Sequence, residues 1–325
     1  MDINNDLPPG KRLPHCDYPG AADIGSHGLQ PLPDELPAMT LAAAQQYRSS
    51  RFQITTADTL NNEKLLQMAR VIAGSFAVND PMIRHLRPPK EWPAGVSGTK
   101  HKDPFGDDEF GSWTKESILF WFIRLFIFTE PFRPLDAIVQ NESALKQSLA
   151  ALNGAGDVIG GALNISLDLS KAAFSIREND PFISAVFSFF EPGAQFLTSQ
   201  VNLSLNALCK KYTAFSTALK AGKVADLNMV ARSPLLPSED TFALVAATVT
   251  HLQQLGFEFL LISAGNQWTG AACGVLGGVK VHFAPYRDLK RVGESNEAIA
   301  DKPSSVDGFI SGKDSGCMFY VVRLK

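Results

Sequence analysis

The chain has 325 residues, of which 45% are hydrophobic, and a formal net charge of −3 at pH 7. This length and composition allow a substantial buried core, and we expect one elaborated globular domain rather than two small ones. Proteins that bind phosphate backbones usually carry clustered Lys and Arg, so the charge argues against a nucleic-acid partner.

The first 48 residues contain repeated prolines and glycines and few periodic apolar positions. This pattern predicts an extended or disordered arm, residues 1–48, ahead of a folded domain at residues 49–325. The arm has no basic segment leading into an apolar stretch, so we expect no secretory signal and a cytoplasmic chain. The cysteines show no paired spacing, which predicts reduced thiols and no metal site, and they are Cys16, Cys209, Cys273 and Cys317.

The segment RFQITTAD, from Arg51, is typical of a first strand, and residues 60–81 predict a first helix. A loop follows at residues 90–111, which we interpret either as a lid over a ligand cleft or as a solvated excursion. Residues 112–128 predict a second helix. Its apolar run is too short to span a bilayer and is interrupted by Arg124, so we expect a buried helix and no membrane partner. The buried side of the first helix comprises Leu65, Met68, Val71, Ile72 and Phe76.

Residues 134–141 (PLDAIVQN) and 156–166 (GDVIGGALNIS) predict a central β-hairpin. The glycines around residue 156 run into a strand instead of opening a helix, which indicates a turn and argues against a dinucleotide fingerprint. An inserted region follows at about residues 167–223. Its second apolar cluster has helical periodicity and predicts a helical insertion.

The most informative stretch runs from Ala225 to Pro285. It reads as a strand (ADLNMVARSP), a helix capped by Ser238 (SEDTFALVAATVTHLQQLGF), a buried strand (EFLLISA), a short helix (GNQWTGAACGVLGG) and a further strand (VKVHFAP). A strand, a helix and a parallel strand in so few residues form a right-handed crossover unit. A ligand is then expected beyond the carboxyl ends of the two strands.

This order resembles the second half of the GNAT (Gcn5-related N-acetyltransferase) acyltransferase fold. Asn266 follows the strand that ends near Ala264, Gly277 stands where the short helix of that family usually ends, and SFAVNDPMIRHL is similar to the end of its first helix. The resemblance implies an α/β protein with a GNAT-like mixed central sheet and flanking helices, here with a helical insertion and an N-terminal arm. It also implies acyl transfer from acetyl-CoA or another acyl-CoA, without a metal, to a small-molecule amine or a peptide.

The resemblance places the co-substrate along the strand before the crossover helix. The loop after that strand, ARSPLLPSEDTF, departs from the family because it has no glycine, two of its residues are prolines without N–H groups, and Glu239 and Asp240 would lie in the first helical turn. We therefore expect weak coenzyme A binding that depends on one arginine of this loop. The implied binding residues are Met229, Val230 and Ala231, whose backbone groups would hold the acyl carbonyl, together with Arg232 and Asn266.

Three residues are candidates for catalysis. Cys273 occupies the position where the family commonly has a tyrosine that protonates the leaving thiolate, but a small buried cysteine in GAACGVLGG is ordinary helix packing, and we favour that interpretation. Asp226 is the candidate base for the amine, and His282 is its rival.

Two other functions remain open. The chain could be a non-catalytic GNAT-like binding or scaffold protein that has lost the pyrophosphate loop. A cysteine hydrolase using Cys273 and His282 is disfavoured, because the sequence has no nucleophile elbow. The sequence also lacks the His-Glu-x-x-His pair of zinc proteases and the Walker loop of nucleotide-binding proteins.

Overall fold

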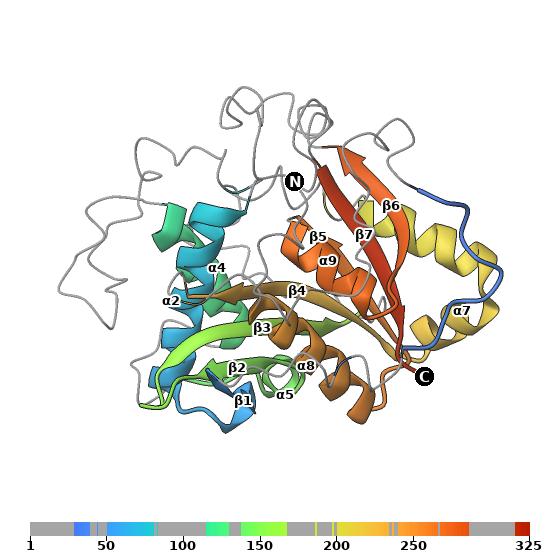
Figure 1. Cartoon of the computed structure of the whole chain (residues 1–325). Helices are drawn as coiled ribbons and strands as arrows, with labels where there is room; N and C mark the ends of the chain where they lie inside the picture. The colour runs from blue at the N-terminus through green and yellow to red at the C-terminus, as the bar shows by residue number, and fades with distance from the viewer. Residues whose placement is uncertain are drawn as a thin grey trace.

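The computed structural model describes residues 29–39, 44, 51–80, 83, 115–129, 138–167, 186, 197, 200–233, 236, 240–265, 267–285 and 316–325. In this part of the chain seven strands form one mixed sheet in the order β1-β2-β3-β4-β5-β7-β6 (Figure 1). β4 and β5 pair in parallel, and all other neighbours pair antiparallel. The strands are β1 (Gln53–Thr56), β2 (Leu149–Leu152), β3 (Val158–Ser166), β4 (Val224–Arg232), β5 (Phe259–Ala264), β6 (Val279–Pro285) and β7 (Gly316–Arg323).

Helices cover both faces of the sheet (Figure 1). One face, called here the α2 face, packs against α2 and α4 over β3 and β4, and against α7 and the helical residues 200–211 over β5 and β7. The opposite face, called the α8 face, packs against α8 and α9. The helices are α2 (Asn62–Asn79), α4 (Lys115–Ile127), α5 (Glu142–Gln147), α7 (Thr213–Lys220), α8 (Asp240–Gln254) and α9 (Gln267–Val275), and a 3-10 turn, η2 (Ala57–Thr59), follows β1.

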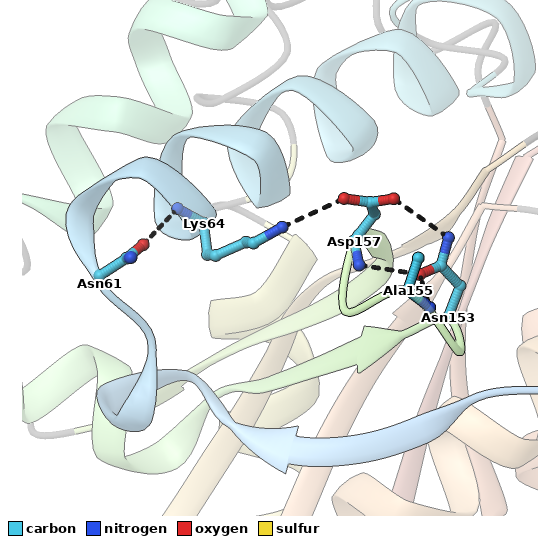
Figure 2. Close-up of polar contacts among 5 residues, drawn as sticks. All are labelled: Asn61, Lys64, Asn153, Ala155 and Asp157. Atoms are coloured by element: carbon cyan, nitrogen blue, oxygen red, sulfur yellow. Dashed lines mark hydrogen bonds and ion pairs between the residues drawn. The ribbon is translucent and has the colours of Figure 1, made fainter.

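The start of α2 is tied to the turn between β2 and β3 (Figure 2). Asn61 caps the helix, because its side-chain oxygen accepts a hydrogen bond from the backbone N–H of Lys64 at 2.9 Å. The Lys64 ammonium lies 3.1 Å from the Asp157 carboxylate and lowers the pKa of that carboxyl. Asn153 closes the turn by accepting from the backbone N–H groups of Ala155 and Asp157. The Asn61 cap and the Lys64–Asp157 ion pair thus fix the position of the first turn of α2 against the sheet.

A glycine lets α2 lie close to the sheet. A Cβ atom on Gly161 of β3 would stand 2.9 Å from Cγ of Met68, closer than real Cβ atoms approach, and 3.3 Å from Cδ1 of Ile72, which is a tight contact. Met68 and Ile72 are fully buried, as the helical periodicity predicts.

The strong apolar run of residues 118–128 lies in and just after α4, where its side chains are buried, in agreement with the sequence. Arg124 is 3% exposed, and its guanidinium carbon lies 4.6 Å from the centre of the Trp121 ring. No helix in the described ranges is long and apolar enough to cross a membrane. The described part of the expected insertion is helical, as predicted, and the Phe215 ring of α7 packs on that of Phe259.

The central hairpin is formed by other residues than those predicted for its first strand. We expected residues 134–141 to supply it, but the hairpin is β2 with β3. Residues 134–137 lie outside the described part, and Asn141 caps α5 by accepting a hydrogen bond from the N–H of Ala144. Because that helix intervenes, the strand begins only at Leu149. The loop at residues 90–111 also lies outside the described residues.

Candidate functional site

The two parallel strands of the crossover unit pair over only part of their length. Val224–Leu227 of β4 pair with Phe259–Ile262 of β5. β4 continues to Arg232 alongside β3, and β5 continues to Ala264 alongside β7, but the two strands form no further pairs with each other. A fork therefore opens between β4 and β5 after Leu227, at the carboxyl ends where the sequence places the ligand.

A β-bulge lies at the same point. Leu163 of β3 pairs with Met229 and Asn164 pairs with Leu227, which leaves Asn228 as the extra residue of β4. In a regular strand Leu227 and Met229 would share a face. Instead Leu227 packs in the α8-face core and Met229 in the α2-face core, so the bulge reverses the alternation. The bulge therefore directly precedes Met229, Val230 and Ala231, whose backbone groups the GNAT resemblance implies as binding groups.

Beyond the bulge, β4 presents one edge of its backbone towards the fork. Met229 and Ala231 bury their side chains under α2, whereas Val230 packs towards α8. Their ladder partners are residues of β3, and no strand in the described ranges pairs with them on the side of β5. Backbone N–H and C=O groups on that edge can bond an extended ligand in the manner of an added strand.

Asp226 precedes the bulge on the α2 face, opposite Ile165 of β3 and Leu261 of β5. Its side chain is half-buried, and its Oδ1 atom is buried and accepts no hydrogen bond from a described residue. Because burial disfavours the charged form, the pKa of Asp226 rises to about 7. A carboxyl group with this pKa can take a proton from an amine near neutral pH.

The start of α8 carries its own counter-ions. Asp240 is 3% exposed in the first turn, and its carboxylate lies 3.3 Å from the guanidinium of Arg51, which precedes β1. Arg232 donates from Nη1 to the carbonyl oxygens of Ser233 and Leu236. The helix N-terminus is therefore compensated by a carboxylate of the chain itself. Arg51 is a residue that sequence reasoning missed, since it lies 189 positions from its partner.

The two remaining catalytic candidates belong to other elements than Asp226, Cys273 to α9 and His282 to β6. Cys273 is fully buried in the core between α8 and α9, where burial raises the pKa of its thiol. His282 lies on β6, three strands from β4, which corresponds to about 14 Å along the sheet. Its Nε2 atom lies 2.6 Å from Oε1 of Gln200, and burial lowers its pKa. Asn266 lies outside the described residues.

Cys317 of β7 lies within electrostatic range of Asp226, and no sequence pattern singles it out. Burial raises the pKa of its thiol, and the nearby carboxylates of Asp80 and Asp226 raise it further. Asp80 is the C-cap of α2, so the end of that helix lies within electrostatic range of Cys317 as well. Within the described residues no group of three or more His, Cys, Asp or Glu side chains could hold a metal ion.

No protein-family profile and no curated protein sequence matches the chain. Solved structures resemble it at low identity. A protein designated arylalkylamine N-acetyltransferase 7, from the yellow fever mosquito Aedes aegypti, is 11% identical over 84% of this chain and 88% of that one, with a TM-score of 0.48. The C-terminal condensation domain of Ebony, in complex with beta-alanyl-dopamine, is 10% identical over 84% and 99%, with a TM-score of 0.46. The Drosophila melanogaster polyamine N-acetyltransferase is 10% identical over 84% and 99%, with a TM-score of 0.40.

The topology itself defines the architecture. A mixed sheet has its parallel pair at β4 and β5, the crossover helix α8 joins those strands, and they separate at a bulge in β4. Antiparallel strands flank this pair, and helices cover both faces. The chain therefore has a divergent GNAT-like α/β fold.

Proposed function

We propose that the chain is an acyl-CoA-dependent N-acyltransferase that transfers an acetyl or other acyl group directly to an amine. The observation that carries the proposal is the fork between β4 and β5, which has a bulge at Asn228 and the half-buried carboxyl of Asp226 beside it. A free strand edge for an extended thioester and a base with a pKa near 7 are the two parts that this reaction needs.

The reaction in this site requires no covalent enzyme intermediate. The amine nitrogen attacks the thioester carbonyl, the C–N bond forms, and the C–S bond breaks as coenzyme A thiolate leaves. Asp226 accepts the proton that the nitrogen loses, and the acid so formed can return it to the thiolate or to water. Backbone N–H groups of Met229, Val230 and Ala231 are proposed to hold the acyl carbonyl as charge develops on its oxygen.

The residues fit the two ends of acyl-CoA unequally. The open edge of β4 suits the extended pantetheine arm, because an amide-containing chain can bond it as a strand would. The diphosphate end would meet Arg232, whose guanidinium bonds loop carbonyl oxygens, and the Asp240 carboxylate at the start of α8. We therefore propose that the pantetheine contacts supply most of the affinity and that Arg232 supplies the diphosphate contact.

The test is release of free coenzyme A from acetyl-CoA over a panel of primary amines. We expect turnover whose kcat/KM rises as pH increases through about 7, because Asp226 must lose its proton to act as a base. Asp226→Asn should lower kcat/KM at least about 100-fold and remove this limb of the pH profile. His282→Gln should keep the limb. Loss of the limb in His282→Gln and its retention in Asp226→Asn would assign the base to His282.

One observation favours the alternative of a non-catalytic binding protein. The ion pair of buried Asp240 with exposed Arg51 occupies the helix end at which a phosphate would otherwise be stabilised. If the donor site has been lost, acetyl-CoA should neither raise the Tm of the wild-type chain nor be consumed with any amine. Thermal stabilisation by acetyl-CoA without turnover would leave binding as the function.

A further inference from the structure

Three polar side chains meet where β4 and β5 separate. The β4–β5 register pairs Asp226 with Leu261 and Leu227 with Ile262, so Asn228 and Ser263 are the next residues of the two strands, at the first position of the open fork. Ser263 is two residues from Leu261, which packs against α7, so Ser263 lies on the α2 face. Ala225 and Leu227 point to the α8 face, so Asp226, which stands between them in β4, also points to the α2 face.

Asn228 lies on the α2 face as well. Its neighbour Leu227 points to the α8 face, and Met229, which follows it, points to the α2 face. Alternation from Leu227 therefore places Asn228 with Asp226 and Ser263. The three residues bring a carboxyl, a carboxamide and a hydroxyl group to one spot.

None of these three side chains makes a hydrogen bond to a described residue, although all three are half-buried. Removing polar groups from water is costly unless they find partners. The residues beside them in the sheet, Ile165, Leu261 and Phe319, supply none. Such a cluster at the mouth of a proposed active site is suited to a polar ligand.

The charge at this spot is negative when the carboxyls are ionised. Asp80 and Asp226 both raise the pKa of the Cys317 thiol on β7, so both carboxylates lie within electrostatic range of that thiol. A second anionic group on a ligand would be repelled there, whereas an ammonium group would be attracted.

We propose that this cluster binds the acceptor, and that the acceptor is a cationic primary amine that carries a neutral hydrogen-bonding group, such as an amino alcohol, and no carboxylate. Asp226 binds the ammonium group, which loses one proton to water before its nitrogen attacks, and Asp226 takes the second proton as the C–N bond forms. Asn228 and Ser263 bond the second group. Amino acids are excluded because their carboxylate would lie in the same cluster as the Asp226 carboxylate. This inference rests on the proposed acyltransferase function and names its substrate class.

Two matched sets of acceptors test the proposal. The aliphatic set is ethanolamine, ethylamine and serine, and the aromatic set is 2-amino-1-phenylethanol, phenethylamine and phenylserine. In at least one set we expect kcat/KM for the amino alcohol to exceed that of the plain amine about 10-fold and that of the amino acid about 100-fold. Asn228→Ala and Ser263→Ala should bring the ratio of amino alcohol to plain amine close to one, with an unchanged KM for acetyl-CoA.

Ser166→Ala is the matched control, because Ser166 lies at the other end of β3 and its hydroxyl donates to Gly222 O. It should leave the acceptor ratio unchanged, and thermal melts should show Asn228→Ala and Ser263→Ala to be folded. If either variant fails to fold, Asn228→Ser or Ser263→Thr replaces it in the same assay. Equal use of amines and their amino acids, or variants that keep the wild-type ratio, would overturn the substrate class while the acyltransferase proposal stands. Absence of turnover with every amine would overturn both.

Discussion

At the scale of single residues, Asp226 links activity to stability. Burial raises its pKa from 3.8 to about 7, so between about pH 4 and 7 the folded chain holds a proton that the unfolded chain has released. The free energy of unfolding therefore falls as pH rises through this window and stays lower above it. The ionised, half-buried Asp226 carboxylate thus lowers the free energy of unfolding above about pH 7.

The substitution Asp226→Asn should remove this destabilisation. At pH 8 we expect the variant to be more stable than the wild type, by up to about 4 kcal/mol, and at pH 4 the two should be nearly equal. Urea unfolding at both pH values measures the difference. A variant that is destabilised equally at pH 4 and pH 8 would show that burial does not perturb this carboxyl.

Cys273 tests the two roles that its sequence position allows. The thiol is fully buried among apolar side chains between α8 and α9, which favours packing over proton donation. We expect Cys273→Ala to lower stability by roughly 1 kcal/mol and to leave turnover nearly unchanged. Coenzyme A release and thermal unfolding of the same preparation provide the check. A stable Cys273→Ala protein with little activity would restore the thiol as the proton donor.

At the scale of elements, the start of α8 decides how the donor is held. Removing Arg232 should weaken acetyl-CoA binding about 10-fold, because a cation facing the diphosphate is lost. Asp240→Asn should instead tighten binding several-fold, since it removes a negative charge and frees Arg51 from its ion pair. Calorimetric titration of acetyl-CoA into the three proteins compares them. Equal submicromolar affinity in the wild type and in Arg232→Ala would contradict this account.

Elements with strong local signals were predictable, and the order of strands was not. The periodicity of α2 and the uniform apolar run of β5 were readable because each is fixed by neighbours in sequence. β7 was not recognised, and it inserts between β5 and β6 although it comes last in the chain. Because β7 lies between β5 and β6, two strands separate His282 on β6 from Asp226 on β4. The order of the elements along the chain does not show this separation.

The candidate site shows the same division between local and long-range information. The crossover order of β4, α8 and β5 is enough to predict a ligand at their carboxyl ends, where the fork opens. The bulge at Asn228 depends on the register of β4 against β3, a pairing between residues more than 60 positions apart. Asn228 and Ser263 could therefore be chosen only after the strands had been aligned.

At the scale of the whole molecule, part of the N-terminal arm belongs to the fold. Leu36 is buried in the core beside α7, and Met39 in the core beside α8. Met39 donates its backbone N–H to the carbonyl oxygen of Arg323 at the end of β7, and the Arg323 guanidinium donates to the carbonyl oxygen of Leu36. This contact joins the two ends of the described chain and covers the end of a central strand.

Two truncations separate the contribution of this contact from that of the preceding residues. We expect residues 29–39 to supply the stabilisation that comes from the arm. Deletion of residues 1–28 should therefore leave the Tm within about a degree of the wild type. Deletion of residues 1–45 should still give a cooperative transition, because the sheet and its helices remain, but the loss of two buried apolar side chains should cost about 3 kcal/mol and lower the Tm by several degrees. Calorimetry of the two truncated proteins measures both effects. The substitution Leu36→Ala in the full chain should reproduce part of the larger loss, and equal Tm values for the two truncations would show that the contact at Arg323 adds nothing to stability.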